Sequence, residues 1–306
     1  MSKKISILIT TKNRLEDLKI TLQHLTSLLS KERVECLVYD DASTDGTFDY
    51  LKAHFPDLIL FRNEKSLGLI HNRNVLLNNC SGDFAISLDD DAHFLSENVV
   101  ESITNYFENH PKCGVIACRI FWGKTAPTSI ATKEIPHRVK GFVGCGHVWN
   151  LKTWRDIPNY PEWFVFYGEE EFASYQLFKK GWEVHYVPEL LVQHRVEVKA
   201  RKNDSDYSQR QRRSFRSGWY LYLLFYPWPI IPKKLAYTLW IQIKTKVFKR
   251  DGRATKGLVL ALWDVFIHIP RLLKESNRFT SEEYQKYSDL EPTKIYWDSE
   301  NESKKL

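Results

Sequence analysis

Short apolar runs alternate with amphipathic stretches along the first 90 residues. Residues 4–10, KISILIT, form a continuous apolar run rich in β-branched side chains, as is typical of a strand buried on both faces. Leucines then recur at steps of three and four residues, which predicts one face of a helix; they are Leu15, Leu18, Leu22, Leu25 and Leu29. Similar runs predict strands at 34–39, 57–61 and 84–88, separated by short helices. This alternation predicts an α/β fold with a mostly parallel central sheet flanked by helices.

Helices and strands continue to alternate beyond residue 95. A helix is predicted at 97–109, and strands are predicted at 113–121 and 182–188, with the glycine-rich stretch GFVGCGHVWN between the two strands. A further helix is predicted to begin near Glu169 and to end at Gly181, because lysines fill its last turn and glycine commonly follows a helix end.

Two acidic clusters follow apolar runs of the first half. DDASTDGT begins at residue 40 and LDDDAHF at residue 88, each at the end of a predicted strand. Ligands of parallel α/β sheets bind beyond the carboxyl ends of the strands, so we expect both clusters at one ligand-binding edge. Adjacent carboxylates repel one another, and Asp89, Asp90 and Asp91 therefore need solvent, cationic partners or a divalent metal. A solvated turn would explain an isolated triplet, but the position directly after an apolar strand favours a metal.

The expected metal is Mg²⁺ or Mn²⁺. Two carboxylates supply only part of the oxygen shell of such a cation, and water and substrate phosphates would supply the remainder. That arrangement suits a nucleoside diphosphate substrate.

Composition and cysteine usage narrow the cellular setting. The 306 residues suffice for one large or two small domains. Five cysteines without a CxxC pair are expected to be reduced thiols of a cytoplasmic protein. The apolar run near the N-terminus is too short for a signal peptide, and no apolar stretch reaches the roughly 18 residues that a spanning helix requires.

The composition changes from about residue 199. Residues 199–280 contain short runs of aromatic and aliphatic residues separated by basic clusters, and we expect a helical, basic-aromatic extension there. The basic residues that localise the net charge are Lys233, Lys234, Lys244, Lys246, Lys249, Arg250, Arg253 and Lys256. Trp and Tyr beside Lys and Arg favour peripheral attachment to a membrane surface, although helices packed on the rest of the protein with solvated charges would have the same composition. No nucleic-acid-binding motif occurs, and residues 281–306 are predicted to form an extended polar tail.

Several motifs resemble those of family-2 glycosyltransferases, which have the Rossmann-like GT-A fold. The resemblance covers residues 4 to about 195 and rests on the order and spacing of six segments, which are SILITTKNR, VYDDASTDGT, KSLGLIHNRN, SLDDDAHF, FYGEEEFASYQLFKKGWEVHYVPE and VQH. It implies a nucleotide-sugar-binding catalytic domain at residues 1–198, followed by the helical extension and the polar tail.

The resemblance implies a nucleotide site at the ends of the first two strands. Thr10 would contact the nucleotide, with Arg14 close by. Asp41 would accept a hydrogen bond from a uracil or thymine N–H, in a pocket that Asp40 helps to shape.

The aspartate triplet matches the D-x-D motif of the same family. Asp91 would coordinate the metal, Asp89 would act at the ribose and the metal, and the intervening Asp90 would have a smaller role in donor binding. Arg73 and Asn74 match a stretch near the nucleotide sugar and phosphates, and helix-surface polarity is the alternative for these two.

Glu169 and Glu170 align with the Glu-Asp motif of the family. Glu170 is one methylene longer than the usual aspartate and is favoured over Glu169 as the catalytic base. Acidic residues suit any helix N-terminus, but that preference does not explain the matching Gly–Glu spacing. His194 matches a histidine often found after the last core strand, where it would ligate the metal or bind a phosphate; a lone histidine is otherwise more often structural.

The implied reaction moves a sugar from a nucleoside diphosphate donor to an acceptor hydroxyl with inversion. UDP is favoured over dTDP and GDP, and the acceptor would be a saccharide or a lipid-linked molecule in cell-surface polysaccharide or glycolipid assembly. One alternative is a non-catalytic sugar-nucleotide or membrane-binding protein of the same fold. The other, a nucleotidyltransferase, would predict a glycine-rich phosphate loop after the first strand, and ITTKNRLED has none.

Overall fold

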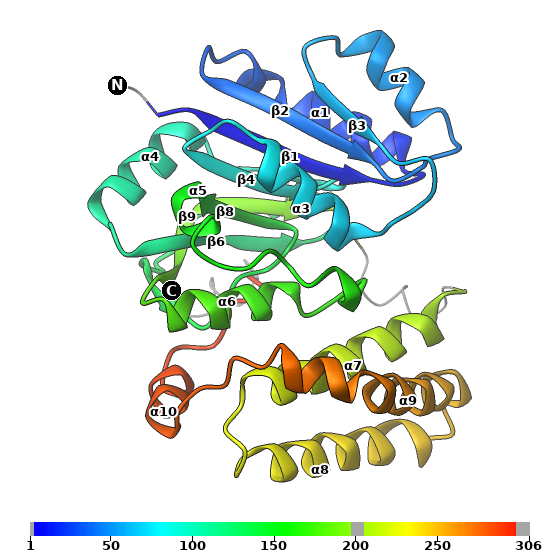
Figure 1. Ribbon diagram of the computed structural model, residues 1–306. Coiled ribbons are helices and arrows are strands. Elements are labelled where there is room, and N and C mark those ends of the chain that lie inside the picture. Colours follow the sequence, from blue (N-terminus) through cyan, green and yellow to red (C-terminus); the bar gives the residue numbers. More distant parts are fainter. Residues whose placement is uncertain (1–2, 197–204, 298–306) are drawn as a thin grey trace.

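The computed structural model describes residues 3–196 and 205–297 (Figure 1). In its first half, strands and helices alternate along the chain. The elements are β1 (Ile5–Thr11), α1 (Leu15–Leu29), β2 (Val34–Asp40), α2 (Thr47–His54), β3 (Ile59–Arg62), α3 (Leu69–Asn79) and β4 (Phe84–Asp89). The strands lie in the order β3-β2-β1-β4, and each neighbouring pair is parallel. The strands and helices predicted for this half are therefore confirmed.

The second half of the sheet is mixed. Its elements are β5 (Ala92–Phe94), α4 (Val99–Asn109), β6 (Cys113–Trp122), β7 (His137–Val139), β8 (Gly146–Asn150), α5 (Leu151–Trp154), the 3₁₀ turn η1 (Glu162–Phe164), α6 (Glu169–Lys179) and β9 (Glu183–His194). β8 runs antiparallel to both β4 and β6, whereas β9 is parallel to β6 and antiparallel to β5 and β7. The parallel arrangement thus holds from β3 to β4, and antiparallel pairs enter with β8.

Helices cover both faces of the sheet, which explains why its central strands are apolar throughout. All seven residues of β1 are buried. One face packs on α1 and α4 and the other on α3, α5 and α6, so that each face has its own apolar core (Figure 1). All five cysteines are buried and free, as expected for reduced thiols.

The C-terminal third forms a helical layer, which lies below the sheet in Figure 1. Its elements are α7 (Tyr207–Phe225), α8 (Ile231–Gln242), the π-helical turn η3 (Ile243–Val247), α9 (Gly252–Lys274) and α10 (Ser281–Ser288). Tyr220 and Phe225 of α7 are buried in the same core as α6, which fixes the layer to the sheet. The expected helices are thus present between residues 205 and 280, while the predicted boundary at residue 198 lies outside the described residues. Within the described ranges, no helix combines the length and the apolar character needed to cross a membrane.

The prediction of an extended tail is wrong for residues 281–288, which form α10. Thr280 caps this helix by accepting a hydrogen bond from the Glu283 backbone N–H, and the Glu283 side chain accepts from the Thr280 N–H in return. Tyr287 is buried against α6, and Trp297 is buried beside the Arg119 guanidinium. Aromatic residues spaced among polar ones therefore anchor this segment; residues 298–306 lie outside the described residues.

Candidate active site

Strands β1, β2 and β4 end side by side, as the strand-end rule predicts. Thr10 lies opposite Asp89 in the pairing of β1 with β4, and Thr11 lies opposite Asp40 in the pairing of β1 with β2. The two acidic clusters therefore meet at one edge of the sheet.

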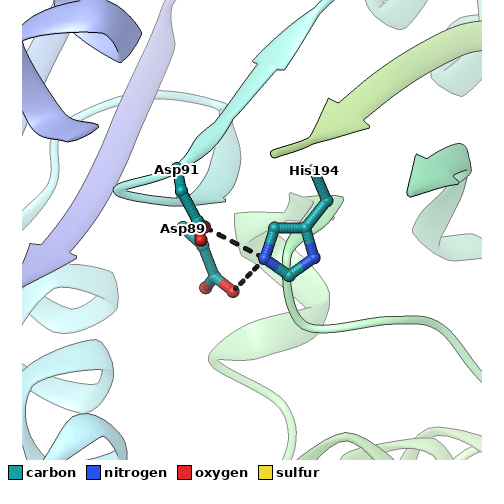
Figure 2. A group of neighbouring side chains, drawn as sticks. All are labelled: Asp89, Asp91 and His194. Atoms are coloured by element: carbon teal, nitrogen blue, oxygen red, sulfur yellow. Dashed lines mark ion pairs between the residues drawn. The ribbon is translucent and has the colours of Figure 1, made fainter. Parts of the chain in front are cut away.

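Asp89, Asp91 and His194 form a compact group at this edge (Figure 2). The Nε2 atom of His194 lies 3.0 Å from Oδ1 of Asp91 and 3.8 Å from Oδ2 of Asp89. The backbone brings the histidine here because β5 pairs antiparallel with the end of β9, which places Ala92 opposite His194. One potential ligand atom from each of the three side chains lies within 4.8 Å of the others.

The donor atoms of this group fit a divalent cation. Asp91 is almost completely buried with its Oδ1 against Nε2 of His194, and Nδ1 of that histidine is buried with no hydrogen-bond partner among the described residues. Buried polar atoms without partners are rare in folded proteins and call for an explanation such as an ion. Two carboxylates and an imidazole, completed by water and phosphate oxygens, suit Mn²⁺ or Mg²⁺.

Arg14 and Asp90 help to hold Asp91 in position. Arg14 Nη2 donates to Oδ2 of Asp91 at 2.6 Å. Burial alone would raise the pKa of Asp91, but its contacts with His194 and Arg14 hold that pKa well below its ordinary value. The Asp90 side chain accepts a hydrogen bond from the Thr11 hydroxyl at 2.8 Å and is itself buried. Asp90 therefore faces the protein interior, where it positions the loop that carries Asp91.

Arg73 of α3 joins the aspartates to the start of α6. Its guanidinium donates to Oδ1 of Asp89 at 2.8 Å and to Oε1 of Glu169 at 3.1 Å, and it lies 3.5 Å from Oε1 of Glu170. The arginine is buried, so its charge is offset by these carboxylates. The D-x-D motif and the glutamate pair, about 80 residues apart in sequence, thus lie on either side of the Arg73 guanidinium. Asn74 instead bonds the backbone of Tyr160 and does not join the group.

The two glutamates differ in accessibility. The side chain of Glu169 is 2% exposed and that of Glu170 is 18% exposed, so that only Glu170 reaches solvent appreciably. Burial raises the pKa of both carboxyl groups, and Arg73 opposes that rise. A carboxylate whose pKa is raised towards neutrality is a better general base than an ordinary one. Glu170 is therefore the more accessible carboxyl group of the pair.

The predicted base-reading residue, Asp41, is held by a loop at residues 63–68. Its Oδ1 accepts hydrogen bonds from Asn63 Nδ2 at 2.7 Å and from the Leu67 N–H at 2.9 Å, and its Oδ2 accepts from Ser66 Oγ at 2.6 Å. Asp40 accepts from the Ser43 N–H and lies 3.5 Å from the Arg62 guanidinium. A nucleobase that contacts Asp41 would therefore lie next to this loop.

Sequence reasoning missed Asn63. This residue follows β3 directly. Its side-chain Nδ2 donates to Asp41 and to Asn72, and its side-chain Oδ1 accepts from the Tyr39 hydroxyl. The strand-end rule that located the aspartates would have found it, because β3 ends at the same edge as β2.

The C-terminal segment also reaches the site. The Trp122 ring lies 4.5 Å from that of His194, and its Nε1 donates to the carbonyl of Ile295. Tyr296 lies beside Trp122 with a ring separation of 5.3 Å. Residues far beyond the motif-bearing part of the chain therefore border the predicted metal site.

Gly144 determines how closely the glutamate can approach Arg73. A Cβ atom at this position would overlap Oε1 of Glu170 and lie 2.9 Å from Nη1 of Arg73. We expect Gly144→Ala to displace the Glu170 carboxylate and to lower kcat about 10²-fold, as misplacement of a reacting group by about 1 Å can do. Steady-state kinetics with saturating donor would measure this loss.

Gly218→Ala is the matched control, because a Cβ atom there meets nothing within 4 Å. It should leave kcat unchanged. Full activity of folded Gly144→Ala would show that Glu170 need not occupy this position.

The mixed sheet flanked by helices, with an Asp-x-Asp pair at the end of β4, has the GT-A fold of glycosyltransferases. Residues 6–172, more than half of the chain, match glycosyl transferase family 2, and the chain belongs to this family. The family and the fold predicted from the sequence motifs are thereby confirmed.

Two relatives illustrate the similarity in sequence. The uncharacterized glycosyltransferase YfnE of Bacillus subtilis is 33% identical over 122 residues, which cover 39% of this chain and 30% of YfnE. An uncharacterized glycosyltransferase of Haemophilus influenzae is 30% identical over 112 residues, covering 37% of each chain. The chain thus spans about a third of the length of these relatives.

Solved structures share the fold at low sequence identity. The mannosyltransferase PcManGT from Pyrobaculum calidifontis, in complex with GDP-Man and Mn²⁺, has a TM-score of 0.58 and 14% identity, covering 86% of this chain and 88% of that chain. S. aureus TarS 1-349 in complex with UDP-GlcNAc has a TM-score of 0.58 and 17% identity, covering 89% and 84%. GalNAc-T7 with UDP, GalNAc and Mn²⁺ has a TM-score of 0.60 and 16% identity, covering 88% and 58%.

Proposed function

We propose that the protein transfers a sugar from a nucleoside diphosphate donor to an acceptor hydroxyl by a single, inverting displacement. The observation that carries this proposal is the convergence at Arg73, which lies 2.8 Å from Asp89 and within 3.5 Å of both glutamates of α6. This convergence supports the proposal because a site for the diphosphate and a base for the acceptor would then be neighbours. A non-catalytic binding protein would need the first of these but not the second.

Each residue of the site has a distinct task in this reaction. A divalent cation held by Asp89, Asp91 and His194 would neutralise charge on the departing diphosphate. Glu170 would accept the proton of the acceptor hydroxyl as that oxygen attacks the anomeric carbon from the face opposite the leaving group. Arg73 would keep the Glu170 carboxylate close to the donor, and Glu169 would help to hold Arg73 in place.

The donor class draws support from the structural neighbours. PcManGT is in complex with GDP-Man and Mn²⁺, TarS with UDP-GlcNAc, and GalNAc-T7 with UDP, GalNAc and Mn²⁺. We favour a pyrimidine nucleotide over GDP, since an aspartate at position 41 suits the N–H of uracil or thymine, and we favour UDP over dTDP by its frequency in the family. The acceptor we propose is a saccharide or a lipid-linked molecule used in cell-surface polysaccharide or glycolipid assembly at the inner face of the cell membrane.

Nucleotide binding provides the first test. Purified protein would be titrated with UDP, dTDP and GDP, each with and without Mn²⁺, while thermal unfolding is followed. A ligand at about 100 times its Kd stabilises the native state by about 2.7 kcal/mol. We expect a rise in Tm with UDP that requires Mn²⁺.

The absence of any nucleotide-dependent rise in a folded sample would contradict the proposal. A metal-dependent rise in Tm with GDP alone would leave the proposed reaction in place and change the proposed donor from a UDP-sugar to a GDP-sugar. Where UDP binds, release of UDP from UDP-sugars in the presence of acceptor mixtures would separate a transferase from a non-catalytic binding protein.

A further inference from the structure

We propose that the outer faces of α8 and α9 form a docking surface for an anionic phospholipid bilayer. This inference gives the proposed membrane location a defined surface, and it depends on the proposed function only for the choice of membrane. It rests on the exposure, spacing and charge of side chains in these two helices.

Helix α9 is apolar on two faces. Its inner face, which includes Leu258, Ala261 and Leu272, is buried against α7 and the sheet-bearing part of the protein. Its outer face also carries large apolar side chains, most of them at steps of three and four residues; they are Val259, Leu262, Trp263, Phe266, Ile267, Ile269 and Leu273, all exposed. A helix that only packed on its own protein would be polar on the outer face.

The outer face of α9 is long enough to be a surface of its own. Residues 259–273 span roughly 21 Å along the helix axis at about 1.5 Å per residue. Trp263 and Phe266 are 59% and 63% exposed and stack on each other with ring centroids 5.7 Å apart. Exposed apolar patches of this kind commonly mark sites that bind protein or membrane.

Helix α8 and the turn after it also expose aromatic side chains. Tyr237 and Trp240 are exposed on α8, and Phe248, which follows η3, is 66% exposed. The Trp240 and Phe248 rings lie 6.0 Å apart, so that the aromatic groups of this segment cluster. In Figure 1, α8 lies at the edge of the molecule farthest from the sheet, where an extended flat partner could reach it.

The charge of this segment points to an anionic partner. Residues 226–274 contain ten basic and two acidic side chains, a net charge of +8, whereas the whole chain carries +6. One of the two acidic residues, Asp264, is buried and paired with Arg212 and Arg216 of α7. The positive charge of the chain is therefore concentrated in the segment that also carries the exposed aromatic side chains.

A bilayer surface fits this combination better than a second copy of the chain does. Trp and Tyr prefer the membrane–water interface, where Lys and Arg meet anionic head groups. A symmetric pair of copies would bring the same basic surface against itself, so that like charges would oppose association. No described helix could span the bilayer, and a helix with apolar and basic side chains lies in the plane of the interface instead.

Vesicle co-sedimentation of the full chain tests the proposal. We expect the protein to bind phosphatidylcholine vesicles that contain phosphatidylglycerol at least about tenfold more tightly than phosphatidylcholine vesicles alone, with the difference reduced at high salt. The double variant Trp263→Ser/Phe266→Ser should lower the partition coefficient at least about tenfold, because two large apolar side chains lose their insertion. Lys244→Gln/Lys249→Gln should weaken only the binding that depends on phosphatidylglycerol.

Ile135→Ser is the matched control, since this residue is exposed but lies before β7, outside the proposed surface. It should bind vesicles like the wild type, and circular dichroism would show that all variants are folded. Absence of vesicle binding at low salt would overturn the proposal, as would a dimer in solution that Trp263→Ser/Phe266→Ser dissociates. Nucleotide-dependent stabilisation uses soluble ligands, so failure of the docking surface and failure of the transferase would be distinguished.

Discussion

Replacing Glu170 by glutamine is expected to lower kcat by about 10³-fold, within the range that removal of a general base produces. Glutamine retains the length of the side chain and an oxygen that can face Arg73, but it cannot accept the acceptor's proton. Donor affinity should stay near the wild-type value, because the reaction step and not the diphosphate contact is lost. Release of nucleoside diphosphate measures kcat, and calorimetry measures donor binding.

Glu171→Gln is the matched control for this experiment. Glu171 is the next residue of α6 and is exposed, so its replacement should leave kcat within about twofold. Near-normal turnover by Glu170→Gln would remove this residue from the mechanism. A larger loss in Glu169→Gln than in Glu170→Gln, with Arg73 and the fold intact, would assign the base to Glu169 instead.

The pH profile provides a second readout of the same residue. A general base acts in its deprotonated form, so kcat/KM should fall as the pH falls through the pKa of Glu170. Burial raises that pKa above its ordinary value of 4.5, and the acid limb should therefore lie above pH 4.5. Glu170→Gln should lose this limb, whereas a variant that only weakened the fold would keep it.

The parts of the site that local patterns encode could be predicted from the sequence. The apolar runs of β1 and β4 identify strands buried on both faces, and the strand-end rule places Thr10 and Asp89 at one edge, where they pair in register. The start of α6 at Glu169 follows from Gly168, whose left-handed backbone, with φ of 88°, precedes the helix.

The remaining contacts depend on packing between distant segments. His194 joins the aspartates only because β5, a strand of three residues, pairs with the end of β9. Such a short strand has no periodicity of its own, so its pairing could not be read from the chain. The bridge made by Arg73 likewise depends on how α3 sits between the sheet and α6, and a buried arginine looks like a surface arginine in sequence.

The wrong prediction of an extended tail at residues 281–288 also arose because contacts between distant segments are not visible in the local sequence. Residues 281–306 are mostly polar, and polarity alone suggests a tail in solvent. The ring of Tyr287 packs against Phe178 and Phe279, and Trp297 donates its backbone N–H to Ile120 of β6. A few aromatic side chains thus suffice to fix a polar segment, because each buries a large apolar area. The capping pair at Thr280 and Glu283 was the local signal that could have revealed α10.

Replacing Asp91 by asparagine should abolish both the Mn²⁺-dependent rise in Tm with nucleotide and the transfer reaction. Asparagine keeps the size of the side chain but removes the charge that faces His194 and offers a cation only a weak neutral oxygen. We expect turnover to fall by at least about 10³-fold, since stabilisation of the leaving diphosphate is among the largest contributions to such a reaction.

Asp90→Asn separates this effect from the consequences of replacing any aspartate at the strand end. Asp90 is the adjacent aspartate, but its side chain faces the interior, where it accepts from Thr11 and lies 3.4 Å from the Arg14 guanidinium, and asparagine still offers an oxygen to both. Its Mn²⁺-dependent stabilisation by nucleotide should therefore persist. Equal loss in both variants would mean that the triplet acts as a diffuse acidic patch, whereas loss in Asp91→Asn alone would support a site with fixed ligands. Because Asp91, Asp89 and His194 bring their potential ligand atoms within 4.8 Å of one another, the second outcome is the one that we expect.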